Sequence, residues 1–165
     1  RRNAWGTWRN WNVTTCGRFT EWGKSVTTVA TDGRTMAADS MVSSGSEMVG
    51  FTQKVQRTED GRVFGSCGAS VDCAMFAKWM QGAGERPELS DDFAALVLKG
   101  SKVFYLCRKL EPIEFILPQA IGSGSDYALG AMLAGKTPHE AVEIACMRDT
   151  RSGGLITSLE AIDDK

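Results

Sequence analysis

The run from Thr27 to Ser40 begins with the residue of greatest chemical interest in this chain. Two short β-rich runs flank the Asp32-Gly33 dipeptide, which favours a tight turn, so we expect a hairpin here. A threonine hydroxyl can attack a peptide carbonyl without help from histidine if the threonine's own α-amine is free to accept the proton. Thr27 would therefore be a nucleophile only as the first residue of a mature chain, and 26 residues precede it in this sequence.

Residues 1–26 differ in composition from the remainder of the chain. They contain four of the five tryptophans and carry a net charge of +4, whereas residues 27–165 carry −5. We interpret residues 1–26 as an N-terminal extension, either a propeptide or a segment read from a misassigned start. Val26 stands where an alternative GTG start codon would be translated as methionine, whose removal would expose Thr27. A permanently retained extension is the third alternative.

The composition of the whole chain indicates one globular domain at residues 27–165. Of the 165 residues, 42% are hydrophobic, and the net charge of −1 argues against a nucleic-acid surface. No apolar run approaches the ~18 residues of a membrane-spanning helix. The five cysteines are odd in number and form no C-x-x-C pair, which favours free thiols in a reducing cytoplasm over disulfides or a metal site.

The expected elements are hairpins first and helices grouped later, an order typical of layered α+β folds. Periodicity predicts helices over residues 69–81, 126–134 and 137–147, the last beginning with a capping box at Thr137 and Glu140. Besides the hairpin at Thr27, short strands are expected at residues 54–55, 62–66, 94–98, 102–106, 114–117 and 155–162.

Six motifs, taken in chain order, carry a resemblance to a known family. They are T-T-V-A at Thr27, A-A-D-S around Asp39, Q-K-V-Q-R around Lys54, G-S-C-G-A-S-V-D around Gly68, G-S-G-S-D-Y-A at Gly122, and R-D-T-R-S-G-G at Arg148–Gly154. Together they resemble the proteasome-type threonine peptidases, N-terminal nucleophile (Ntn) hydrolases that include proteasome β subunits and the bacterial HslV peptidase. The last motif fits the R-D-x-x-S-G-G signature of proteasome β subunits.

The resemblance implies a fold and an assembly. The fold would be a four-layer αββα sandwich, with two antiparallel sheets between helices. One helical layer would be shortened, because residues 82–93 leave room for little more than a turn of a second helix. The resemblance also implies a homo-oligomeric ring that cleaves peptides or unfolded proteins, an ATPase unfoldase as a partner, and no metal or cofactor.

The resemblance assigns the reaction centre to four positions. Thr27 would be the nucleophile and its amine the base. Lys54 would lower the pKa of the Thr27 hydroxyl, and Asp39 would hold Lys54 in place. Gly68 would supply a backbone N–H to the oxyanion hole.

Five further positions complete the implied site. Ser123, Asp149 and Ser152 would orient the amine and pass its proton. The backbone around Ser43 would pair with an extended peptide, and Ser66 would line the first specificity pocket.

Three alternatives remain open from the sequence. The chain would be an inactive ring or assembly subunit if the extension were retained. It would be another amide hydrolase if the same chemistry acted on small amides. Thr28 would replace Thr27 as nucleophile if processing fell one residue later.

Overall fold

The computed structural model describes residues 27–162, which form two antiparallel sheets and a separate hairpin. The first sheet has the order β10-β1-β2-β11, and the second has the order β5-β6-β7-β8-β9. The strands of the first sheet are β1 (Thr28–Thr31), β2 (Thr35–Ala38), β10 (Gln119–Gly122) and β11 (Thr157–Glu160). Those of the second are β5 (Val55–Arg57), β6 (Val63–Cys67), β7 (Ala94–Lys99), β8 (Lys102–Cys107) and β9 (Ile113–Phe115).

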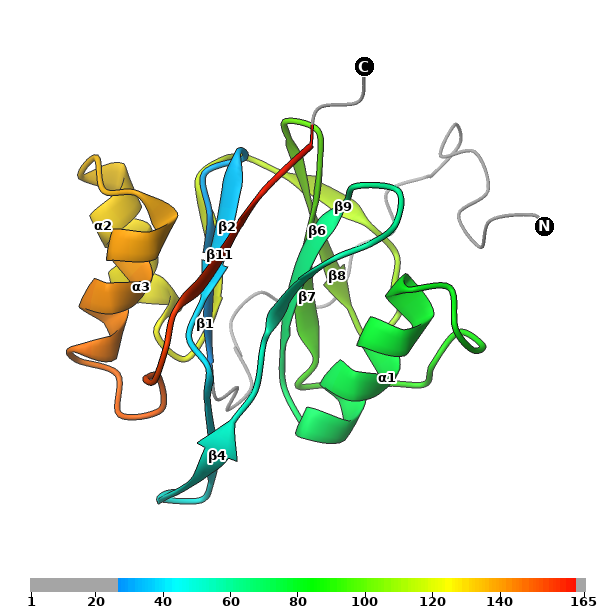
Figure 1. Ribbon diagram of the computed structural model, residues 1–165, viewed down its shortest axis with the longest axis horizontal. Helices are drawn as coiled ribbons and strands as arrows, with labels where there is room; N and C mark the ends of the chain where they lie inside the picture. Colours follow the sequence, from blue (N-terminus) through cyan, green and yellow to red (C-terminus); the bar gives the residue numbers. More distant parts are fainter. Residues whose placement is uncertain (1–26, 163–165) are drawn as a thin grey trace.

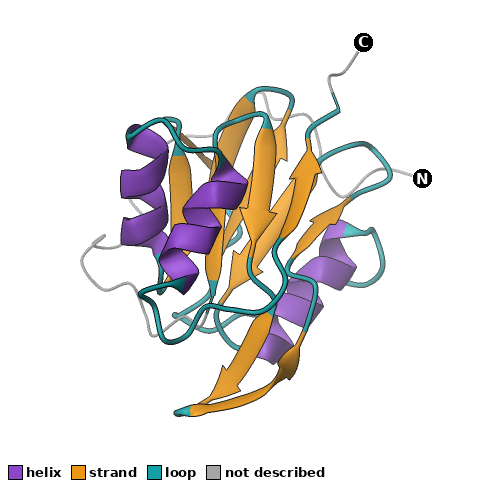
Figure 2. Ribbon diagram, turned by 60° about the vertical axis from the view of Figure 1, so that its left-hand side comes forward, coloured by secondary structure: helices purple, strands orange, loops and turns teal. Residues whose placement is uncertain are grey.

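Helices cover the outer faces of the two sheets, as Figures 1 and 2 show. Helices α2 (Ser125–Leu133) and α3 (Pro138–Cys146) pack on the first sheet, and α1 (Ser70–Met80) packs on the second. No helix lies between Gln81 and Phe93, so the α1 layer is the short one. The predicted α+β class and αββα sandwich are therefore confirmed.

Alternation along the strands divides the apolar side chains among three cores. Val29 of β1 and Met36 of β2 face inward and pack with Leu96 of β7 between the sheets. Their neighbours Ala30 and Ala37 face α2 and α3. Because successive strand residues point to opposite faces, neighbouring apolar residues of β1 and β2 contribute to two different cores.

Two local predictions are confirmed at atomic detail. Strands β1 and β2 form the expected hairpin, in which an Asp32 side-chain oxygen accepts hydrogen bonds from the Arg34 and Thr35 N–H groups at 2.9 and 2.7 Å. Helix α3 begins with the expected capping box, in which the Thr137 hydroxyl and the Glu140 carboxylate each accept from the other residue's backbone N–H. These side chains satisfy backbone donors that a turn or helix start leaves open.

The structure also contains strands that the sequence did not indicate. Strands β3 (Met41–Ser44) and β4 (Glu47–Phe51) form a hairpin that projects from the sandwich (Figure 2), and β10 ends on Gly122, the first residue of the G-S-G-S motif. The strand expected at residues 114–117 instead spans Ile113–Phe115. It ends before Pro118, which has no N–H to donate to a ladder.

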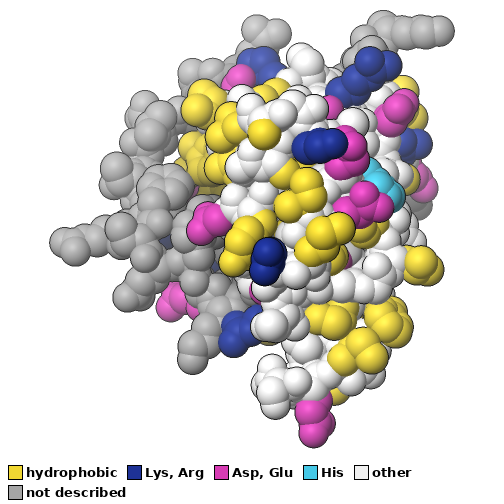
Figure 3. All heavy atoms as spheres, turned by 90° about the vertical axis from the view of Figure 1, so that its left-hand side faces the viewer, with side chains coloured by type: hydrophobic (Ala, Val, Ile, Leu, Met, Phe, Trp, Pro, Cys, Tyr) yellow, Lys and Arg dark blue, Asp and Glu magenta, His cyan; other side chains and the backbone are white. Residues whose placement is uncertain are grey.

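The outer surface of the α2 and α3 layer exposes several large apolar side chains (Figure 3). Leu133 is 70% exposed and Met147 77% exposed.

Within residues 27–162, no helix is long and apolar enough to cross a membrane. The extension at residues 1–26 and its interpretation lie outside the described residues.

Candidate active site

A cavity of about 590 Å³ opens beside the start of β1. Its walls come from β3, from the segment before β5, and from the junction between β6 and α1. Five of the predicted site residues line it, namely Thr27, Ser43, Lys54, Ser66 and Gly68. The other four, Asp39, Ser123, Asp149 and Ser152, are not part of the wall but connect to Thr27, Thr28 or Lys54 through hydrogen bonds.

Asp39 and Lys54 form a buried ion pair at the edge of the cavity. Asp39 follows β2 and is 1% exposed, and its two oxygens lie 3.0 and 3.1 Å from Lys54 Nζ. Lys54 Nζ also donates to the Met41 carbonyl at 2.6 Å. Burial lowers the pKa of Lys54 from its usual value, and the charge of Asp39 opposes this shift. The structure therefore brings together the predicted lysine and aspartate.

Asp39 is also an acceptor for three backbone N–H groups. Thr28 N donates to Oδ1 at 2.9 Å, while Met41 N and Gly153 N donate to Oδ2 at 3.2 and 3.0 Å. The carboxylate thus joins β1, the start of β3 and the S-G-G segment. A buried carboxylate with this many donors has its hydrogen-bonding capacity satisfied.

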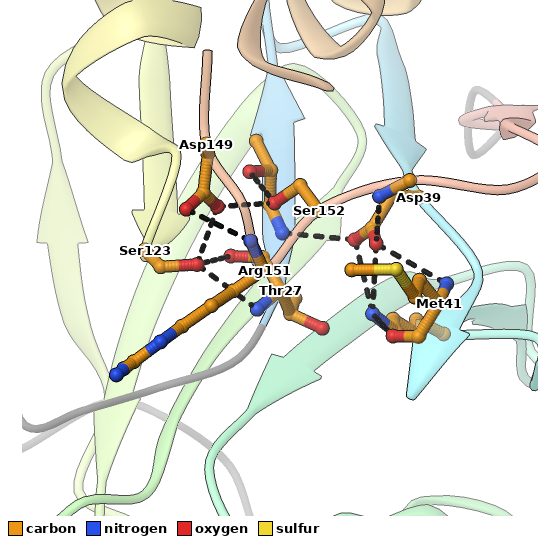
Figure 4. A network of polar contacts seen from close by, with 10 residues as sticks. Thr27, Asp39, Met41, Ser123, Asp149, Arg151 and Ser152 are labelled. Carbon is orange, nitrogen blue, oxygen red and sulfur yellow. Dashed lines mark hydrogen bonds and ion pairs between the residues drawn. The ribbon is translucent and has the colours of Figure 1, made fainter. Parts of the chain in front are cut away.

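A second network contains Ser123, Asp149 and Ser152, as Figure 4 shows. The Ser123 and Ser152 hydroxyls both donate to Asp149 Oδ2 at 2.6 Å. Because the single Ser123 proton is directed to Asp149, the Ser123 oxygen is free to accept from Thr27 N, 3.3 Å away. The three residues form a relay in which Ser123 connects the Thr27 nitrogen to the Asp149 carboxylate and Ser152 connects that carboxylate to the Thr28 hydroxyl.

The two threonines at positions 27 and 28 have different surroundings. Thr27 lines the cavity, whereas Thr28 is fully buried and absent from its wall. The Thr28 hydroxyl lies 2.7 Å from Ser152 Oγ, and it is the donor because the Ser152 proton is directed to Asp149. None of the hydrogen bonds of Lys54 within residues 27–162 goes to the Thr27 hydroxyl.

Gly68 lies at the cavity wall where β6 leads into α1. Its φ is +127°, and a Cβ there would be 3.1 Å from both the Asp92 carbonyl oxygen and Phe93 Cα. A side chain would therefore be strained by conformation and by contact. The oxyanion role of its N–H stays a prediction.

Gly122 supports the start of β1, and sequence reasoning did not assign it a role. A Cβ at Gly122, whose φ is +99°, would lie 2.0 Å from the Thr27 carbonyl oxygen. The sequence analysis also did not predict the contact of the Thr28 hydroxyl with Ser152 or that of the Gly153 N–H with Asp39. Thr28 and Gly153 lie inside the T-T and S-G-G motifs, and membership of these motifs was the sequence signal that could have indicated a role for them.

Other reactive groups lie near the cavity. Burial raises the pKa of the Cys73 thiol, which lines the wall, and burial with the charges of Asp39 and Asp149 raises that of Cys146 to about 11. A protonated thiol is a poor nucleophile. The chain's single histidine, His139, bonds Ser158 Oγ at 2.8 Å and does not line the cavity.

Comparison with known proteins found solved structures of similar fold but no matching family model and no matching curated protein. A structure of Thiobacillus denitrificans BPH in complex with epoxomicin has a TM-score of 0.67 at 20% identity, covering 84% of this chain and 99% of that chain. A second structure of Thiobacillus denitrificans BPH has a TM-score of 0.64 at 21% identity, with the same coverage. At these identities the likeness shows the fold.

Proposed function

We propose that this chain is a threonine-type endopeptidase of the proteasome-like Ntn-hydrolase class, with Thr27 as its nucleophile after removal of residues 1–26. The observation that carries the proposal is the position of Thr27. It lines the cavity, its nitrogen contacts the Ser123–Asp149–Ser152 relay, and the buried Lys54–Asp39 pair lies at the same cavity. The absence of His139 from the cavity wall favours an amine as the base.

In the proposed reaction, the amine of Thr27 accepts the proton that its hydroxyl loses and later gives a proton to the leaving group. The Thr27 oxygen forms a bond to the substrate carbonyl carbon, while the hydroxyl proton passes to the freed amine through a water. The Gly68 N–H stabilises the oxyanion. The amine then protonates the leaving nitrogen as the peptide C–N bond breaks, and water hydrolyses the resulting ester. Lys54 stabilises the developing negative charge on the threonine oxygen.

The assembly belongs to the same proposal. We infer a homo-oligomeric ring in the cytoplasm that acts on peptides or unfolded proteins, with an ATPase unfoldase as its partner. Native mass spectrometry of the protein from its own host would give the number of subunits and reveal a co-purifying ATPase. A monomer at cellular concentration would contradict the ring.

The N-terminus of the natively produced protein tests the proposal most directly. Intact-mass measurement should find a chain that begins at Thr27 and cleaves fluorogenic peptides. Thr27→Ala should abolish cleavage, and Thr27→Ser should retain part of it because the hydroxyl is kept. An assembled chain that retains Val26 and is inactive would support the alternative of an inactive ring or assembly subunit.

Epoxomicin provides a second probe, because a protein with the same fold has been solved in complex with it. Epoxomicin should inhibit peptide cleavage by the processed chain and bind less tightly to Thr27→Ala. Equal binding of epoxomicin to the processed chain and to Thr27→Ala would argue against Thr27 as the residue that contacts it.

A further inference from the structure

Asp92 lies at the cavity wall beside the predicted oxyanion position. It is exposed and precedes β7, at the end of the segment that follows α1. Its carbonyl oxygen is the atom that a Cβ on Gly68 would approach to 3.1 Å. Asp92 is therefore a close neighbour of the backbone that is expected to receive the reacting carbonyl.

The charge of Asp92 is not neutralised within the described part of the chain. Among the cavity-lining residues within 27–162, Asp92 and Lys54 alone carry ordinary acidic or basic side chains, and Lys54 is paired with Asp39. Asp92 forms no ion pair with residues 27–162, whereas the adjacent Asp91 pairs with Arg108 at 2.9 Å. Within the described residues, the cavity wall thus has one unpaired negative charge, at Asp92.

The segment that presents Asp92 is fixed by a buried carboxylate. Asp72 of α1 is 8% exposed and accepts hydrogen bonds from the backbone N–H of Ser90, at 3.0 Å, and from its hydroxyl. Ser90 also lines the cavity. Asp92 therefore follows a tethered residue, which limits how far its backbone can move.

The remaining walls suit a side chain with an apolar stem and a polar end. Phe64, Ala74 and Ala77 supply apolar surface, while Ser66 and Ser70 supply hydroxyl groups. Lysine and arginine side chains have an apolar stem and a polar end, because their methylene groups pack on apolar surface while their charged ends bind polar partners. A volume of about 590 Å³ is within the range of ~300–1,000 Å³ typical of ligand pockets.

We propose that the cavity receives the lysine or arginine side chain of a peptide substrate at the residue whose carbonyl Thr27 attacks, and that Asp92 determines this preference. The inference rests on the proposed peptidase function and adds the substrate class. The carboxylate attracts the cation, the apolar wall packs against its stem, and no covalent step involves Asp92.

The test compares arginine with citrulline, its uncharged analogue of nearly equal shape, in otherwise identical fluorogenic peptides. The processed protein should cleave the arginine peptide with a kcat/KM about two- to fivefold higher, the range for an exposed ion pair. High salt should reduce this ratio. Asp92→Asn should bring it close to one, and Asp92→Lys should make a glutamate peptide better than the arginine peptide.

Asp91→Asn is the matched control, because it removes a neighbouring exposed carboxylate that does not line the cavity. It should leave the arginine-to-citrulline ratio unchanged. Equal loss in both variants would mean that general surface charge is responsible, and would overturn the role of Asp92. A wild-type ratio of one, or a ratio unaffected by Asp92→Asn, would overturn it as well.

A binding measurement separates this inference from the peptidase proposal. Titration calorimetry with Thr27→Ala, which cannot react through that hydroxyl, should show tighter binding of the arginine peptide than of the citrulline peptide. If the arginine peptide binds more tightly but the processed protein with Thr27 unaltered does not cleave it, the peptidase function is contradicted and the role of Asp92 is retained. If the processed protein cleaves both peptides equally well, the peptidase function is retained and the role of Asp92 is contradicted.

Discussion

Asp39 makes more contacts than its predicted role requires. Holding Lys54 would need one ion pair, yet the carboxylate also accepts from the backbone of Thr28, Met41 and Gly153. Those N–H groups come from three separate segments that meet at the cavity. Asp39 is therefore a structural centre as well as a partner of Lys54.

Removal of Asp39 should cost more stability than removal of Lys54. Asp39→Ala leaves the buried Lys54 ammonium without its counter-charge and three N–H groups without their acceptor, and we expect a loss of about 3–5 kcal/mol in the free energy of unfolding. Lys54→Met should cost less, because Asp39 keeps its three backbone donors. Urea unfolding of both variants would measure this, and a larger loss for Lys54→Met would refute the ordering.

Gly122 offers a test of the close approach to Thr27. Gly122→Ala should lower the free energy of unfolding by about 3 kcal/mol or more, because the new methyl group meets the Thr27 carbonyl at a positive φ. Gly130→Ala is the control, since nothing lies within 4 Å of that position in α2. The control should gain about 0.5–1 kcal/mol from helix propensity. Similar effects of the two substitutions would contradict the structure.

The sequence predicted which residues meet at the site, but not every contact they make. Motif order identified Thr27, Asp39 and Lys54, and the structure brings all three to one end of the sandwich. It did not identify the close approach of Gly122 to the Thr27 carbonyl. Gly122 and Thr27 are 95 positions apart in the chain, and no local pattern encodes their distance.

At the scale of elements, the start of α3 is sensitive to pH. Hydrogen bonds from Thr137 and from Lys136 hold the pKa of Glu140 at about 2, below its usual 4.5. Because the folded-state pKa is lowered, this contribution to stability is present above pH ~4.5 and is lost as the pH falls toward 2.

Glu140→Gln should therefore reduce the loss of stability between pH 4.5 and 2. Thermal unfolding across this range would measure it. Glu143→Gln changes an exposed glutamate of the same helix that is not in the capping box. It should leave more of the pH dependence of stability intact than Glu140→Gln does. Identical profiles for Glu140→Gln and the unaltered protein would contradict the capping-box contribution.

The helices were easier to predict than the strands for a physical reason. The start of α3 follows from a local signal, Thr137-Pro138 with Glu140, whose contacts lie within one turn. Strands β3 and β4 lack an alternating pattern because much of the hairpin is exposed, including Met48 and Phe51. With little burial to select one face, their composition did not indicate a strand.

At the scale of the whole molecule, the two sheets depend on their shared core. Leu96 of β7 is fully buried between them, so Leu96→Ala should lower the free energy of unfolding by about 2–5 kcal/mol. Ile116→Ala changes a side chain that is 85% exposed and should have little effect. Chemical denaturation would compare them, and a small loss for Leu96→Ala would argue against a tightly packed inter-sheet layer.

The polar groups around Thr27 have an unequal count of formal charges. Asp39 and Asp149 contribute two negative charges, and Lys54 contributes one positive charge. While Thr27 N is part of a peptide bond it adds none, which leaves the group at −1. When a free amine takes up the threonine proton it gains a positive charge, the attacked carbonyl oxygen gains a negative charge, and the total stays at −1. On the proposed mechanism, this imbalance favours the protonated amine that forms as the threonine oxygen attacks.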